Sequence, residues 1–282
     1  MEIKKLGVVG AGTMGNGIAQ IAAQIGCEVV MRDIEMRFVE GGMKKVEAFL
    51  AKSVEKGKLE AKEKDAILGR IKGTVDMADL KDVDLVVEAV LEDIDLKKSV
   101  FKELDEICRP EVILATNTSS MSITEIAAST KRPDKVCGMH FFNPVPLMRL
   151  VEIIRGYATS DETIRITTDL AQRMGKTTVE VKKDSPGFIV NRIMTPHFLE
   201  AIRMVEEGIA SIEDIDKAVK NGLNYPMGPF EFMDLTGIDI AYHVTEYLYK
   251  ELNKENKWVS PNLMKTMIRS GNLGRKTGKG WY

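Results

Sequence analysis

The stretch LGVVGAGTMG, residues 6–15, decides the fold of this chain. An apolar run of strand character leads into three spaced glycines, and a helical pattern follows over residues 16–25. In such a turn the first glycine permits the bend, the second lets the backbone approach a phosphate, and the third allows helix and strand to pack closely. The new helix offers free N–H groups and partial positive charge. The stretch therefore predicts a phosphate-binding βαβ unit, with contacts from Gly10, Gly12, Thr13, Met14 and Gly15.

An acidic residue follows the second expected strand, residues 28–32. Asp33 lies 18 residues past Gly15, where a carboxylate accepts hydrogen bonds from both adenosine ribose hydroxyls of NAD. It also repels the 2′-phosphate of NADP, at a cost of about 4 kcal/mol at 4 Å and an effective dielectric near 20. Arg32 and Arg37 lie nearby, and either would weaken this preference by turning toward the ribose. We expect NAD as the cofactor; the alternative is an ordinary strand–helix turn with a surface aspartate.

Short β-branched runs alternate with helical patterns up to about residue 184, as is typical of parallel βαβ units. We therefore predict an α/β domain of Rossmann type, with a mostly parallel sheet, over residues 1–184. The expected strands span residues 6–9, 28–32, 71–75, 85–88, 112–116, 136–140, 151–154 and 177–181.

Two further regions are helical. Residues 35–70 are charge-rich and interrupted near Gly57, which predicts a helical arm of two helices inserted into the α/β domain. Beyond the stretch DSPG, residues 184–187, strand-like runs end and helical periodicity continues. Ser211, followed by two acidic residues, marks one helix start. We place a domain boundary after residue 184 and expect an all-α domain over residues 185–282.

Composition excludes several classes of partner. Lys and Arg number 40 against 42 Asp and Glu, so no overall charge favours nucleic acid or an anionic membrane. No apolar run approaches the roughly 20 residues that cross a bilayer, and the first strand is too short and glycine-interrupted for a signal peptide. Cys27, Cys108 and Cys137 lie far apart and favour a reducing compartment, each as a small buried residue. We expect a cytoplasmic protein without a bound metal.

The three histidines differ in their positions. His140 ends an apolar strand, where an open α/β sheet directs side chains into its ligand crevice. The segment FFNPVP, residues 141–146, is too proline-rich to extend the strand or begin a helix. A histidine exchanges a proton near neutral pH, so beside a nicotinamide it suits the acid–base step of alcohol oxidation. His197 and His243 lie on helical patterns, where a structural role is favoured.

Five segments resemble those of the L-3-hydroxyacyl-CoA dehydrogenase family. They are NTSS at 117–120, HFFNPVPLMRLVEII at 140–154, DSPGFIVNR at 184–192, YPMGPFEFMD at 225–234 and GRKTGKGWY at 274–282. With the glycine-rich loop and the helical arm, they span essentially the whole chain in the family's order. The similarity is particularly to the bacterial 3-hydroxybutyryl-CoA dehydrogenases.

This resemblance implies a role for each matched position. His140 is the general acid/base, and Glu152 holds its imidazole and favours the charged form. Ser119 hydrogen-bonds the substrate oxygen, and Asn191 steadies the thioester side of the acyl group. Lys56, on the arm, lies near the CoA phosphates, with a solvated lysine as an equal alternative. The positions expected around NAD, besides the glycine-rich loop and Asp33, are Glu92, Lys97, Asn117, Ser119, Asn143 and Lys276.

Some matched positions also have structural explanations. Ser119 and Ser120 could cap the helix expected to follow them. Asn143 precedes a proline, as in many turns. Glu152 alone would be an exposed charge at a strand edge. Only the combination of His140 with Glu152, in a chain with a dinucleotide loop, favours the catalytic interpretation.

The implied reaction is the reversible conversion of (S)-3-hydroxybutyryl-CoA and acetoacetyl-CoA with NAD⁺ and NADH, in fatty acid and butanoate metabolism. The acyl-CoA thioester is the expected substrate; acyl length and physiological direction stay open. Family members use the C-terminal domain for substrate binding and dimerisation, so we expect a homodimer, which a single-chain mass at every concentration would contradict. Two alternatives remain: another hydroxyacid or gulonate dehydrogenase, which needs no arm for CoA, and a non-catalytic NAD-binding protein of the crystallin kind, which does not need the His–Glu pair.

Overall fold

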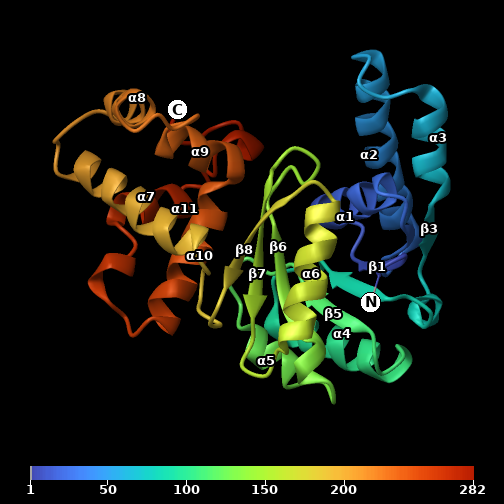
Figure 1. Ribbon diagram of the computed structural model, residues 1–282. Helices are drawn as coiled ribbons and strands as arrows, with labels where there is room; N and C mark the ends of the chain where they lie inside the picture. The colour runs from blue at the N-terminus through green and yellow to red at the C-terminus, as the bar shows by residue number, and fades with distance from the viewer. Residues whose placement is uncertain (1) are drawn as a thin grey trace. The chain divides into compact units, whose positions relative to one another are not determined.

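Eight strands form one sheet in the first part of the chain (Figure 1). The computed structural model describes residues 2–282, and the strand order is β3-β2-β1-β4-β5-β6-β7-β8. Every neighbouring pair is parallel except β6 and β7, which are antiparallel. This confirms the predicted mostly parallel sheet, with each strand end within one residue of its expected place. The strands are β1 Lys5–Val9, β2 Glu28–Arg32, β3 Ile71–Thr74, β4 Leu85–Glu88, β5 Ile113–Thr116, β6 Val136–Phe141, β7 Leu150–Arg155 and β8 Thr177–Val181.

The central strands are buried along their whole length. All residues of β4 (LVVE) and β5 (ILAT) are buried, as expected for parallel strands covered by helices on both faces. On α1, the apolar residues Ile18, Ile21 and Ala22 pack into the same core as the strands. The helices of this part are α1 Thr13–Gln24, α4 Ile94–Ile107, α5 Ile123–Ala127 and α6 Asp161–Arg173, with short 3₁₀ turns η1 Met77–Leu80 and η2 Pro133–Lys135.

The inserted arm consists of two helices that lie side by side, α2 Met36–Glu55 and α3 Ala61–Gly69 (Figure 1). The apolar face of α2 is buried, and Ile67 from α3 joins the same core. Gly57, at the turn between the helices, has a φ of 65°, a conformation that favours glycine. The break expected near residue 57 is therefore confirmed.

The chain divides into two compact units, Met1–Asp184 and Ser185–Tyr282. The second unit is built from helices around its own core, in which the rings of Phe230 and Trp281 meet at 5.2 Å. Ser211 caps a helix, as predicted, because its Oγ accepts a hydrogen bond from the N–H of Asp214 at 3.1 Å. The helices are α7 Val190–Glu206, α8 Ile212–Gly222, α9 Pro229–Thr236, α10 Ile238–Glu251 and α11 Asn262–Arg269, with η3 Asn256–Trp258 and η4 Arg275–Thr277.

Within residues 2–282, no helix is both long enough and apolar enough to cross a membrane.

Candidate active site

Four adjacent parallel strands bring the predicted site residues to one edge of the sheet. Gly10 follows β1, Glu88 ends β4, Asn117 follows β5 and His140 lies near the end of β6. Since neighbouring strands are about 4.8 Å apart, His140 is about 10 Å from β4 and about 14 Å from β1 across the sheet. The N–H of Asn117 donates to Glu88 O at 2.8 Å, and its Oδ1 accepts from the N–H of Phe141 at 2.9 Å. Asn117 therefore joins three of these strands where they end.

The glycine-rich loop has the shape that a dinucleotide phosphate requires. Gly10 has a φ of 103°, and a Cβ on Gly15 would overlap the Gly10 carbonyl oxygen. A Cβ on Gly12, by contrast, would meet no protein atom within 4 Å, so space lies in front of it. Gly12 gives α1 no side-chain cap, and the first turn of α1 holds no acidic residue. The N-terminal amides of this helix thus suit an anion, and the residues present fit NAD.

This contrast makes Gly12→Ala an informative variant. Because the added methyl group meets no protein atom, the variant is expected to keep the wild-type melting temperature while its affinity for NADH falls by about 10-fold or more. NADH fluorescence titration measures the affinity, with Gly69→Ala, another position with open space, as the control. Wild-type NADH affinity in Gly12→Ala would place the pyrophosphate elsewhere.

Asp33, which was expected to bind the adenosine ribose, is hydrogen-bonded to the glycine-rich loop. Its Oδ2 accepts from the N–H of Ala11 at 2.7 Å and its Oδ1 from the N–H of Ile34 at 2.7 Å. A carboxylate has about four acceptor positions, so two remain for ribose hydroxyls. Both arginines that could oppose NAD selectivity are held by other groups: Arg32 Nε donates to a carbonyl at the end of β3, and Arg37 pairs with Glu35 at 2.9 Å.

His140 and Glu152 form a buried pair. They are directly opposed in the antiparallel register of β6 and β7, which puts both side chains on one face of the sheet. His140 Nδ1 lies 2.7 Å from Glu152 Oε2, and the side chains are 7% and 0% exposed. An ionised carboxylate only accepts hydrogen bonds, so a contact with ionised Glu152 requires Nδ1 to be the donor. Because Glu152 is buried, the alternative that it is an exposed charge at a strand edge is wrong.

The segment after β6 is held in place by Lys176, a residue that was not predicted from the sequence. Lys176 Nζ donates to the carbonyl oxygens of Val145 at 2.6 Å and Met148 at 2.7 Å, and burial lowers the pKa of this lysine. The ring of Phe142 lies 4.4 Å from that of His140, centroid to centroid. Asn143, expected beside NAD, is exposed in this segment.

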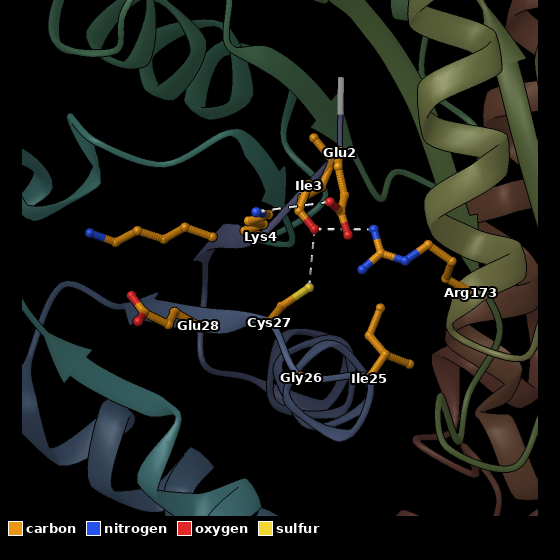
Figure 2. A pocket seen from close by; sticks show the side chains of 9 residues that line it. Glu2, Ile3, Lys4, Ile25, Gly26, Cys27, Glu28 and Arg173 are labelled. Atoms are coloured by element: carbon orange, nitrogen blue, oxygen red, sulfur yellow. Dashed lines mark hydrogen bonds and ion pairs between the residues drawn. The ribbon is translucent and has the colours of Figure 1, made fainter.

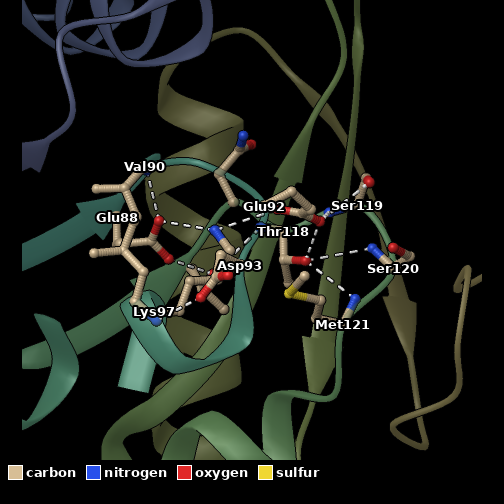
Figure 3. A network of polar contacts seen from close by, with 12 residues as sticks. Glu88, Val90, Glu92, Asp93, Lys97, Thr118, Ser119, Ser120 and Met121 are labelled. Atoms are coloured by element: carbon tan, nitrogen blue, oxygen red, sulfur yellow. Dashed lines mark hydrogen bonds and ion pairs between the residues drawn. The ribbon is translucent and has the colours of Figure 1, made fainter. Parts of the chain in front are cut away.

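Ser119, Glu92 and Lys97 lie in one polar network (Figure 3). Glu92 Oε1 accepts from the N–H of Ser119 at 2.8 Å and from its Oγ at 3.3 Å. Lys97 Nζ lies 3.3 Å from Glu92 Oε2 and 2.9 Å from Glu88 Oε1. The structure thus brings together three of the predicted residues, with Lys97 only 1% exposed.

One alternative from the sequence is wrong, and three other residues keep their status as predictions. Neither Ser119 nor Ser120 caps α5, because the N-cap is Ser122, whose Oγ accepts from the N–H of Glu125.

Lys56 is exposed at the end of α2. Asn191, in the first turn of α7, and Lys276, which donates to Asp239 Oδ2 at 2.6 Å, belong to the second unit, and their roles toward NAD and substrate stay predictions.

The buried carboxylate of Glu88, which pairs with Lys97, was not among the residues predicted from the sequence. Glu88 is 0% exposed, and its Oε2 accepts from Thr116 Oγ1 at 2.7 Å. A signal was present, since an acidic residue ends the apolar run LVVE of a fully buried strand. A charge in such a place requires a buried partner. The sequence did not show that Lys97, nine residues later, supplies it.

The cysteines have no role at this site. All three are buried and free. Burial raises the pKa of Cys108 to about 11 and that of Cys137 to about 12, and it also raises the pKa of Cys27. A thiol that stays protonated is a poor nucleophile, so the expectation of small buried residues is confirmed.

A surface pocket elsewhere in the first unit lies at the opposite edge of the sheet, where β1 and β2 begin (Figure 2). There Cys27 Sγ and Arg173 Nη1 both approach the carbonyl oxygen of Ile3, at 3.6 and 3.1 Å. The pocket is separated from His140 and the glycine-rich loop by the length of the strands, so it is not part of the candidate site.

Family models and relatives match this chain along its length. The model of the 3-hydroxyacyl-CoA dehydrogenase NAD binding domain matches residues 5–185, and that of the 3-hydroxyacyl-CoA dehydrogenase C-terminal domain matches residues 187–282. The 3-hydroxybutyryl-CoA dehydrogenase of Clostridioides difficile is 47% identical over 278 residues, 99% of this chain and 98% of that protein. The structure of (S)-3-hydroxybutyryl-CoA dehydrogenase from Ralstonia eutropha is also 47% identical, with a TM-score of 0.96 over 100% of this chain and 99% of that one.

The fold, the phosphate loop and these matches define the class, which is that of the NAD-dependent dehydrogenases. Within that class the chain belongs to the 3-hydroxyacyl-CoA dehydrogenase family, as its motifs predicted, and NAD is its cofactor.

Proposed function

We propose that this protein interconverts (S)-3-hydroxybutyryl-CoA and acetoacetyl-CoA, with His140 as the general acid/base. The observation that carries the proposal is the buried His140–Glu152 pair at the carboxyl edge of the sheet, two strands from Glu88 and three from the phosphate loop. The names of the relatives support the acyl-CoA substrate and its four-carbon acyl group.

The chain's part in the reaction is the transfer of one proton. NAD⁺, which the glycine-rich loop and Asp33 would hold, would supply the acceptor for the hydride from C3 of the alcohol. His140 Nε2 takes the hydroxyl proton as the C–O single bond becomes a C=O double bond. Nδ1–H stays hydrogen-bonded to Glu152 at 2.7 Å. The buried carboxylate stabilises the imidazolium that forms, and in the reverse direction the imidazolium returns the proton to the oxygen.

Other residues orient the substrate. Ser119, held by Glu92, binds the reacting oxygen, and Asn191 steadies the thioester oxygen, where negative charge spreads in the ketoacyl form. Lys52, Lys56 and Lys58 are exposed together where α2 ends, and their charges suit the CoA phosphates. The unit Ser185–Tyr282 supplies Asn191 and, in the proposed homodimer, the dimer contact.

Initial rates with paired substrates and cofactors test the proposal. Acetoacetyl-CoA with NADH is expected to exceed free acetoacetate by about 100-fold or more in kcat/KM, because binding energy from the CoA portion is used at the reacting centre. NADPH is expected to be poorer than NADH by about 10-fold or more, because Asp33 repels the 2′-phosphate. A longer 3-ketoacyl-CoA in the same assay measures the limit of acyl length.

Each outcome separates this proposal from an alternative. Equal rates with acetoacetyl-CoA and acetoacetate would favour a dehydrogenase of free hydroxyacids. NADH binding without turnover of either substrate would favour a non-catalytic NAD-binding protein.

A further inference from the structure

We propose that the buried ion pair of Glu88 and Lys97, acting through Glu92, holds Ser119 in place for the reacting oxygen. We call this series of contacts the relay. This inference rests on the proposed function, because it gives Ser119 a substrate to orient. The relay runs from Glu88 at the end of β4, through Lys97 on α4, to Glu92 in the loop between them and then to Ser119 after β5 (Figure 3).

The inner end of the relay is rigidly held. Glu88 Oε1 accepts from the N–H of Val90 at 2.6 Å and from Lys97 Nζ at 2.9 Å, while Oε2 accepts from Thr116 Oγ1 at 2.7 Å. Glu88, Lys97 and Thr116 are each no more than 1% exposed. A buried carboxylate with three donors has one stable arrangement, so the Lys97 ammonium group is fixed in space.

The outer end is held by this fixed charge. The Glu92 side chain is 39% exposed and would otherwise favour water, but Lys97 Nζ lies 3.3 Å from its Oε2. Lys97 itself is 1% exposed and already contacts two carboxylates. In the described structure, Lys97 therefore reaches Ser119 through Glu92. Without the ammonium group, Glu88 and Glu92 would repel each other, and Glu92 would turn toward solvent.

Glu92 lies closer to the backbone N–H of Ser119 than to the hydroxyl group of that residue. Oε1 accepts from Thr118 Oγ1 at 2.5 Å and from the N–H of Ser119 at 2.8 Å, whereas Ser119 Oγ lies at 3.3 Å. The contacts at 2.5 and 2.8 Å are the shorter ones, so Glu92 holds the chain at Thr118 and the backbone N–H of Ser119. Ser119 Oγ thus extends from a backbone that Glu92 holds in place.

The test uses a neutral double variant. Lys97→Met alone leaves Glu88 buried without its partner, whereas Glu88→Gln with Lys97→Met removes both charges at nearly constant volume. We expect this double variant to retain its fold by circular dichroism and to lose about 10- to 100-fold in kcat, because the reacting groups shift slightly. Asp105→Asn is the matched control: Asp105 is on the same helix, pairs with Arg132 at 2.6 Å, and is remote from the site. Its kcat is expected to stay within about 2-fold of wild type.

A double-mutant cycle with Ser119→Ala assigns the loss to the relay. If the relay acts through Ser119, the loss from Glu88→Gln/Lys97→Met shrinks to less than about 3-fold in the Ser119→Ala background. An equal loss in both backgrounds, or no loss in either, overturns the relay. If the double variant does not fold, Glu92→Gln enters the same cycle, since its amide oxygen can still accept from Ser119 while the attraction to Lys97 is lost.

The failure of the relay and that of the proposed function have different signatures. Normal turnover of acetoacetyl-CoA by Ser119→Ala contradicts the proposed role of Ser119 and, with it, the relay. A large loss in Ser119→Ala together with additive effects contradicts the relay alone. NADH fluorescence titration is the readout besides activity: a loss of NADH affinity that equals the loss of kcat/KM would assign the network to cofactor binding instead.

Discussion

Replacing His140 with glutamine is expected to lower kcat for acetoacetyl-CoA reduction by about 10²–10⁴. Glutamine fills a similar space and its amide N–H can still donate to Glu152, whose Oε2 lies 2.7 Å from His140 Nδ1. It cannot give or take a proton at the position of Nε2, so only the proton transfer is lost. Stopped-flow or initial-rate measurement at saturating substrate gives kcat directly.

The chain offers two matched controls for this variant. His197 stacks on Tyr225 with ring centroids 5.5 Å apart, and His243 lies on α10. His197→Gln and His243→Gln are expected to keep kcat within about 3-fold of wild type, because both lie on helices where a structural role is favoured and such substitutions have small effects. A comparable loss in all three variants, or near-normal turnover in His140→Gln, would remove His140 from the mechanism.

Glu152→Gln is expected to produce a loss of similar size, about 10²–10⁴ in kcat, with little change in the KM for acetoacetyl-CoA. An amide can donate to Nδ1, which favours the tautomer with the proton on Nε2, and it stabilises the imidazolium less than a carboxylate does. In a serine protease, the equivalent exchange beside a catalytic histidine lowers kcat by about 10⁴. Since the residue is nearly isosteric and 0% exposed, packing is preserved.

The control for charge removal is Glu180→Gln on β8. Glu180 pairs with Arg155 at 3.0 Å, but its side chain is 36% exposed, so the ion pair contributes about 0–1 kcal/mol to stability. This variant is expected to keep wild-type kcat, and thermal unfolding shows whether either substitution affects folding. If Glu152→Gln were as active as Glu180→Gln, orientation of His140 by Glu152 would be excluded.

The fold could be predicted from the sequence because its signals are local. The glycine-rich loop, the β-branched runs and the break at Gly57 each show their structure within a few residues. The mostly parallel sheet followed from the βαβ pattern, which brings the carboxyl ends of parallel strands to one edge. The antiparallel step between β6 and β7 was not expected, because the short Pro-containing connection has no strong strand-pairing signal.

Only part of the candidate site could be predicted from the sequence. Its proposed acid/base pair was predicted from the position of His140 and from family resemblance, since sequence spacing does not show that Glu152 faces His140. The pairing of Glu88 with Lys97 depends on how α4 packs over β4, which is a long-range property. Lys176 was missed for the same reason: nothing in a lysine before a strand shows that two backbone carbonyls surround it.

The antiparallel pairing of β6 and β7 fixes the geometry of the His140–Glu152 pair independently of the connection between the two strands. The distance between His140 and Glu152 depends on the register of two strands, in which they are direct partners, and not on the eight residues 142–149 that connect the strands. A change in the length of that connection is therefore expected to leave the proposed acid/base pair in place, provided that the ladder is intact.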